Sequence, residues 1–335
     1  MPDQEETVYV LGAGANQLLL DDNRIRPPMA RNLFEVAEAL QRFSGSRANE
    51  YSSLFAYIAQ FWHRERDWLT HNSFDLEECL SLIDDQLREA EEGPYRTYLG
   101  RARFQLISLL AGTLAEYRSH PQGSSFEPFA YLCELMRCGV VITFNYDCLV
   151  EGSLQSSFVT RRPSHLPTWP SSVIDEARSR VGDWTADEIS WWMRDVFRLA
   201  HYGIDFDDVL VHFPGRPLEF MPMDLFRPHI PAAAPILKIH GSLNWWRCVA
   251  REPHSTDASS FDRRDRLILA PESHWNWHGA SAPTGGGWVL DPVVVPPTAS
   301  KSDILDFPVY RALFRSIWHR ATEALHECSR VVLIG

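Results

Sequence analysis

The stretch VVITFNYD at residues 140–147 decides the fold. Its first half is a short β-branched run, which is typical of a buried parallel strand. Its second half places Asn145 and Asp147 just past that strand, where the ligands of open α/β sheets collect. Residues two apart in an extended segment point the same way, so an amide and a carboxylate can face one pocket. The alternative is a β-turn closed by Asn and Asp, two residues that dominate turns.

The composition describes a globular chain. Its 335 residues, 45% of them hydrophobic, suffice for one large domain with inserts, or for two domains. The net charge of −12 argues against a dedicated nucleic-acid-binding surface, which is normally basic. No run approaches the roughly 18 apolar residues of a membrane span, and the acidic residues 1–7 do not resemble a signal peptide. We therefore expect a soluble cytoplasmic protein that binds neither nucleic acid nor membrane.

Cysteine and histidine spacing argues against a metal site. The six cysteines include no C-x-x-C pair, so reduced and mostly buried thiols are expected. His274 and His278 are four apart, as metal ligands on a helix can be, but Pro271 and Gly279 bracket them. A loop is expected there, and no metal is assigned.

A second strand signal, VYVL at residues 8–11, runs into five small or polar residues: Gly12, Ala13, Gly14, Ala15 and Asn16. Two glycines with a small residue between them let a phosphate approach backbone N–H groups. A complete dinucleotide fingerprint would need glycine at Gln17. The alternative is an ordinary tight turn.

The chain between these two strands has a helical pattern. Apolar residues at helical spacing predict helices over residues 30–43, 51–62, 76–87 and 104–114. The third of these follows Asp75, with Glu78 three residues later, which resembles a capping box. Residues 45–120 are therefore interpreted as a helical insert. Another helix, over residues 127–137, is expected to lead into the 140–142 strand, as in a doubly wound sheet.

Residues 153–235 carry nine prolines around one amphipathic helix at residues 186–200. Proline at this density breaks regular structure, so the segment is interpreted as an insert that is not part of the sheet. The segment is either a lid over the pocket or an insert that only packs against the rest of the protein, here called a packing excursion.

A third strand, ILKI at residues 236–239, delivers His240 at its end. Gly241 beside it would let the imidazole meet a substrate without crowding from a neighbouring Cβ. The strands at 140–142 and 236–239 should lie side by side in one parallel sheet, so that Asn145 and His240 meet in one crevice. If both line a pocket, replacing them should change stability little.

The rest of the chain alternates between connections and regular elements. Residues 251–292 are interpreted as a connection with a strand-like piece at 267–270, and an apolar run ends at 293–295. An amphipathic helix is predicted over residues 310–325, and a last strand follows at 331–334.

Taken together, GAGAN (12–16), TFNYD (143–147), LKIHGSLNW (237–245), VVPPT (294–298) and VVLIG (331–335) resemble the sirtuin-like NAD-consuming domain. More narrowly, the motifs resemble the bacterial branch of this family that is found in antiphage defence proteins. The resemblance spans the whole chain. It implies one α/β catalytic domain over residues 1–335, with a Rossmann-like doubly wound parallel sheet. Because the family continues into a glycine-serine turn at the cofactor, the domain is expected to be incomplete at Gly335.

The resemblance also implies a role for each matched residue. Asn145 and Asp147 correspond to the ribose-side and water-positioning pair, and His240 corresponds to the catalytic base. The implied NAD-binding residues are Gly12, Ala13, Gly14, Ala15, Asn16, Thr143, Gly241, Ser242 and Gly335. No metal is implied.

The implied activity is hydrolysis of NAD to nicotinamide and ADP-ribose, by a regulated effector of antiphage defence that depletes NAD. The zinc-binding cysteine pairs of the deacylases are absent, and residues 17–28 do not match their proline-Asp-Phe-Arg segment, which argues against protein deacylation. A non-catalytic sensor that binds NAD or ADP-ribose and signals through assembly is the alternative. The family also implies a homo-oligomer and a partner such as an ATPase or an Argonaute-like protein.

Overall fold

A computed structural model gives the structure of the chain, and its described part covers a defined set of residues. These are residues 7–15, 25, 28–119, 139–146, 150, 171, 175, 178–179, 185, 202, 204, 206–211, 219–223, 236–251, 266–269, 284–285, 288–294 and 308–335. The predicted helices at 127–137 and 186–200, together with Asn16, Asp147, His274 and His278, lie outside this set.

A four-stranded parallel sheet carries the strands that the sequence predicts. It consists of β1 (Thr7–Leu11), β2 (Val140–Thr143), β5 (Ile236–Lys238) and β10 (Arg330–Ile334), in the order β10-β1-β2-β5. The expected pairing of the second and third of these strands is confirmed by their parallel register, in which Val141 lies opposite Ile236. The fold is therefore α/β, with a parallel sheet compatible with a Rossmann-like arrangement.

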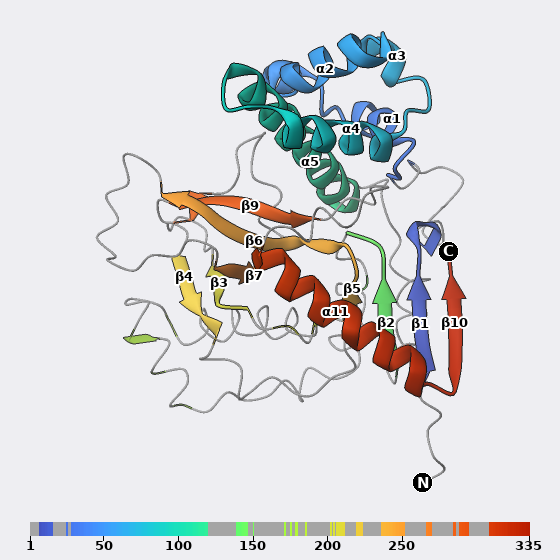
Figure 1. Ribbon diagram of the computed structural model, residues 1–335, viewed down its shortest axis with the longest axis vertical. Coiled ribbons are helices and arrows are strands. Elements are labelled where there is room, and N and C mark those ends of the chain that lie inside the picture. Colours follow the sequence, from blue (N-terminus) through green and yellow to red (C-terminus); the bar gives the residue numbers. More distant parts are fainter. Residues whose placement is uncertain are drawn as a thin grey trace.

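The helix α11 (Pro308–Glu327) leads into β10 and runs across one face of the molecule beside β5 (Figure 1). Its apolar side is buried at Phe314, Ile317 and Ala321, three and four residues apart, as the sequence pattern predicts. This confirms the helix predicted over residues 310–325. The helix thus covers part of the sheet next to the strand that carries His240.

A helical block follows β1 in the chain and precedes β2. It contains α1 (Leu33–Ala39), the short 3-10 helix η2 (Gly45–Asn49), α2 (Ser52–Trp62), α3 (Arg66–Leu69), α4 (Leu76–Glu89) and α5 (Pro94–Ser119). Figure 1 places the block beyond the carboxyl ends of β1 and β2. Side chains from α1, α2, α4 and α5 form its core, with Leu54, Tyr57, Leu80 and Leu106 each at most 2% exposed. The helices predicted within residues 45–120 are therefore present.

Local signals explain where these helices begin and end. The Asp75 side chain accepts hydrogen bonds from the main-chain N–H groups of Glu77 and Glu78, so the predicted cap of α4 is confirmed. Pro94 starts α5, at a position where its missing N–H costs nothing. The helix predicted over residues 30–43 is wrong in length, because the chain leaves the helical region after Ala39 and Gln41 has a φ of 58°.

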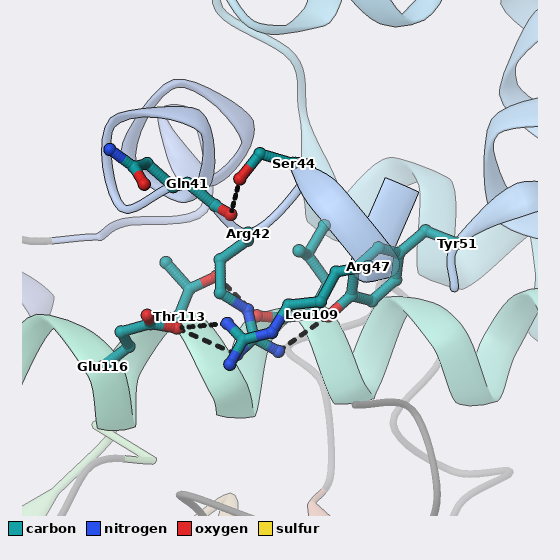
Figure 2. A network of polar contacts seen from close by, with 8 residues as sticks. All are labelled: Gln41, Arg42, Ser44, Arg47, Tyr51, Leu109, Thr113 and Glu116. Atoms are coloured by element: carbon teal, nitrogen blue, oxygen red, sulfur yellow. Dashed lines mark hydrogen bonds and ion pairs between the residues drawn. The ribbon is translucent and has the colours of Figure 1, made fainter. Parts of the chain in front are cut away.

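A buried arginine joins the first and last helices of the block (Figure 2). The Arg42 guanidinium donates to the Tyr51 hydroxyl at 2.7 Å and to a Glu116 carboxylate oxygen at 3.0 Å, and Arg47 donates to the same oxygen. Burial alone would lower the pKa of Arg42, but Tyr51 and Glu116 outweigh it, so the pKa is raised. The network therefore holds a permanent charge inside the block, with α5 supplying its counter-charge.

A second sheet, which the sequence analysis did not predict, lies beyond β5. Its six strands are β3 (Asp208–Val211), β4 (Glu219–Pro222), β6 (Gly241–Arg251), β7 (Leu267–Leu269), β8 (Thr284–Gly285) and β9 (Trp288–Val294), in the order β4-β3-β7-β6-β9-β8. All pairs are antiparallel except β3 with β7. Only the short β7 matches a strand signal that the sequence analysis recognised. A single parallel sheet is therefore an incomplete description.

The interpretation of residues 153–235 as an insert outside the parallel sheet agrees with its described strands, which belong to the second sheet instead. β3 and β4 come from this segment and form one edge of the second sheet. Proline is compatible with this position, because Pro222 ends β4, an edge strand on which a missing N–H breaks no central ladder. The lid and the packing excursion remain alternatives for the undescribed part.

Two properties of the described residues bear on compartment. No helix among them is long and apolar enough to cross a membrane. Cys79 and Cys248 are free and buried, as expected for reduced thiols, and Cys328 is free and partly exposed.

Candidate functional site

The carboxyl ends of three neighbouring parallel strands meet at one edge of the first sheet. The register places Leu11 of β1 opposite Thr143 of β2, and Thr143 opposite Lys238 of β5. The segments that follow these strands therefore start side by side. They carry the glycine turn, the loop with Asn145, and His240, which is the grouping that the sequence predicts at this edge.

The glycine turn is a tight one, closed by a hydrogen bond from the Ala15 N–H to the Gly12 carbonyl at 3.0 Å. The Gly12 N–H donates to the Ile334 carbonyl at 2.9 Å, so the turn begins on the β1–β10 ladder. A Cβ on Gly14 would lie 2.6 Å from the Gly335 carbonyl carbon. The structure thus brings Gly335 to the turn, and it gives Gly14 a packing reason that needs no phosphate.

Four hydrogen bonds hold the main chain after β2. The Phe144 N–H donates to the Leu11 carbonyl at 3.0 Å, and the Asn145 N–H donates to Thr143 Oγ1 at 3.1 Å. The Asn145 carbonyl accepts from Lys238 Nζ, and the Tyr146 carbonyl accepts from Ser242 Oγ, each at 3.4 Å. Residues 144–146 form neither a turn nor a helix, and Asp147, the other residue of the β-turn alternative, lies outside the described residues.

His240 lies against the loop that carries Asn145. The imidazole meets the Phe144 ring edge to face, with centroids 5.4 Å apart, and the Tyr146 ring lies 6.0 Å away. His240 is 5% exposed and Asn145 is 7% exposed. The structure therefore brings His240 into contact with the residues on either side of Asn145. The depth of both residues corrects the expectation that they can be replaced at little cost in stability, because a truncated buried ring leaves a cavity.

The structure gives a backbone reason for glycine at position 241. Its φ of +82° lies in the left-handed region, and a Cβ there would overlap the Val293 carbonyl oxygen of β9. The residue is needed because the chain turns sharply from β5 into β6 against a neighbouring strand.

Tyr146 connects the site to the helical block. Its side chain packs with Ala111 and Leu114 of α5, while its main chain belongs to the site loop. Burial raises the pKa of the Tyr146 phenol well above its ordinary value, and the nearby Glu77 raises it further. The phenol therefore stays neutral at physiological pH and acts as a packing group.

Two buried polar residues at the site were missed by the sequence analysis. Lys238 is 1% exposed and lies two residues before His240, and Asn244 of β6 is fully buried and exchanges hydrogen bonds with Tyr202 at 2.9 and 3.2 Å. A lysine inside the apolar run ILKI was a visible signal, because charged residues are rarely fully buried. Asn244 gave no comparable signal, because its partner is 42 residues away.

The remaining predicted site residues are placed as follows. Thr143 ends β2 and is 1% exposed, and Ser242 is fully buried at the start of β6. Ala13 is exposed and Ala15 buried in the glycine turn. Among the described residues, no group of three His, Cys, Asp or Glu side chains could hold a metal ion.

Two comparisons with known proteins were made. Neither a scan against protein-family models nor a search of curated proteins finds a match.

Proposed function

We propose that this chain hydrolyses NAD, cleaving the bond between nicotinamide and ribose to give nicotinamide and ADP-ribose. The observation that carries the proposal is the contact of the His240 ring with the rings of Phe144 and Tyr146, which sets the imidazole against the loop that bears Asn145. The glycine turn lies on the neighbouring strand of the same sheet edge, where a dinucleotide could lie across the strand ends.

The chemistry needs few groups. As nicotinamide leaves, positive charge develops on the ribose, and water must reach the sugar on the opposite face. An amide such as Asn145 can orient that water or a ribose hydroxyl without adding charge. A histidine, with an ordinary pKa of about 6.5, can accept a proton near neutral pH. Asp147, two residues beyond Asn145, would favour the cationic sugar as a carboxylate.

The low exposure of Asn145 and His240 favours a regulated enzyme. Both side chains are less than a tenth exposed, so NAD must displace whatever covers them before it can react. An enzyme that is closed at rest would not exhaust the NAD of its cell. The role in antiphage defence, the homo-oligomer and a partner ATPase or Argonaute-like protein are proposed on the resemblance of motifs alone.

The test is release of nicotinamide from NAD by the wild-type chain and its variants. His240→Ala and Asn145→Ala should each lose about 100-fold or more in rate. The double variant should lose far less than the product of the two, because groups that act on one transition state fail as a unit. His240→Gln fills more of the space than alanine and separates lost chemistry from lost packing.

His319→Ala is the matched control, since this histidine is exposed on α11 and pairs with Glu323. It should keep wild-type activity. Undiminished hydrolysis in a folded His240→Gln protein would remove the base from the mechanism. Binding of ADP-ribose by a wild-type chain that releases no nicotinamide would favour the sensor.

A further inference from the structure

Lys238 is a buried cation that the proposed reaction does not use. It is 1% exposed in β5, between Leu237 and Ile239, which are equally buried. Taking an ammonium out of water is costly, and a methionine would fill a similar volume without that cost. A buried lysine at this position therefore needs polar groups around its amine, and those groups show what it does.

The Lys238 amine contacts the main chain of Asn145, with Nζ 3.4 Å from the carbonyl oxygen. The other main-chain group of Asn145, its N–H, donates to Thr143 Oγ1 at 3.1 Å. Thr143 and Lys238 face each other across the β2–β5 pairing. The side chains of Thr143 and Lys238, which lie opposite each other on paired strands, thus bind the N–H and the carbonyl of Asn145.

The main chain of the residues before and after Asn145 is hydrogen-bonded as well. The preceding residue, Phe144, is tied to Leu11 of β1, and the carbonyl of the next residue, Tyr146, accepts from Ser242 of β6. Residues from four strands, β1, β2 and β5 of the first sheet and β6 of the second, therefore bind this loop. Lys238 is the one ionisable donor among these four hydrogen bonds.

We propose that Lys238 is a positioning residue for NAD cleavage, which holds the main chain of Asn145 so that the side-chain amide starts from one fixed place. This inference rests on the proposed function, because the positioned amide matters only if Asn145 acts on the substrate. The effect of Lys238 on rate passes through Asn145.

Lys238→Met tests this, because it keeps the length of the side chain and removes the donor. The turnover number kcat should fall about 10- to 100-fold, the size of effect that a misplacement of about 1 Å produces, while KM changes little. Lys238→Gln retains a donor and should recover part of the lost rate. Lys238→Gln also provides the test of the proposal if the Lys238→Met protein does not fold.

The decisive comparison is the same substitution in an Asn145→Ala background. If Lys238 acts only by placing Asn145, Lys238→Met should cause no further loss of kcat there. An equal fold-loss in both backgrounds would show that Lys238 acts independently of Asn145 and would overturn the proposal. A rise in KM with kcat unchanged would overturn it as well.

Amide hydrogen exchange tests the proposal without activity. Peptides that contain residues 143–146 should exchange faster in Lys238→Met than in the wild type, while peptides from α5 should be unchanged. Ser242→Ala, which frees only the Tyr146 end, is the comparison. Should the wild-type chain release no nicotinamide, the proposed function fails. Unchanged exchange at residues 143–146 would separately refute the hold on the loop.

Discussion

Replacing Gly241 by alanine is expected to destabilise the protein by about 2–5 kcal/mol, the sum of two separable effects. The first is conformational: the φ of +82° lies in the left-handed region, which costs an alanine about 1–2 kcal/mol. The second is steric: the new Cβ would overlap the Val293 carbonyl oxygen and lie 3.4 Å from Phe314 Cζ of α11. Overpacking of this kind typically costs about 1–3 kcal/mol.

Two other glycines separate these effects. Gly45 has a φ of +60° with nothing within 4 Å of an added Cβ, so Gly45→Ala should show the conformational cost alone, about 1–2 kcal/mol. Gly100 lies within α5, also with open space, so Gly100→Ala should stabilise by about 0.5–1 kcal/mol. The difference between the losses at Gly241 and Gly45 measures the clash with β9.

The assay is urea unfolding at equilibrium, with the midpoint and slope fitted for the wild type and each variant. A loss at Gly241 no larger than the loss at Gly45 would refute the steric argument, because it would mean that β6 and β9 move apart freely. A stabilised Gly241→Ala protein would refute the left-handed backbone itself.

Two further outcomes are expected. Gly112→Ala should destabilise by about 1–3 kcal/mol, because its Cβ would overlap the Arg42 guanidinium that Tyr51 and Glu116 hold in place. In an Arg42→Met background the same change should be neutral or stabilising by up to about 1 kcal/mol, and an equal loss in both backgrounds would show that Arg42 is not the obstacle. The free energy of unfolding should fall as the pH rises above about 9, because burial raises the pKa of Cys79 in the folded protein and the unfolded chain gives up its proton first. Below that pH the contribution of Cys79 is fully present. The free energy of unfolding, measured by urea titration from pH 7 to 11, should fall less steeply for Cys79→Ala than for the wild type. The difference in slope should be about 1.4 kcal/mol per pH unit, and parallel curves would contradict the raised pKa.

The helices and strands that could be predicted from the sequence are those whose signals, such as an apolar run or a helix cap, lie within a few neighbouring residues. β1, β2, β5 and β10 are short apolar runs, and α4 has both its apolar stripe and the Asp75 cap within a few residues. The parallel pairing of β2 with β5 also followed, because strand ends that carry polar residues collect at one edge. The grouping of His240 with the Asn145 loop was therefore within reach of the sequence.

The second sheet was not within reach, because its strands are defined by distant partners. β6 is polar at Ser242, Asn244 and Arg247, yet it runs through the middle of the sheet. It pairs with β9 from some 40 residues later, with register shifts that break any simple alternation. Asn244 can be buried there only because Tyr202 supplies its hydrogen bonds. No periodicity within the strand encodes that pairing.

The pairing of β1 with β10 has a consequence for how the chain folds as it is made. Thr7 lies opposite Arg330, whose guanidinium donates to the Thr7 hydroxyl, so the first strand meets a partner synthesised more than 300 residues later. On the ribosome, β1 can pair with β2 once residue 143 has emerged, but its other edge stays open until residues 330–334 have emerged as well. The glycine turn, which packs against Gly335, cannot reach its final surroundings before then. A nascent chain thus cannot complete its candidate NAD site until the residues of β10 and Gly335 have been made.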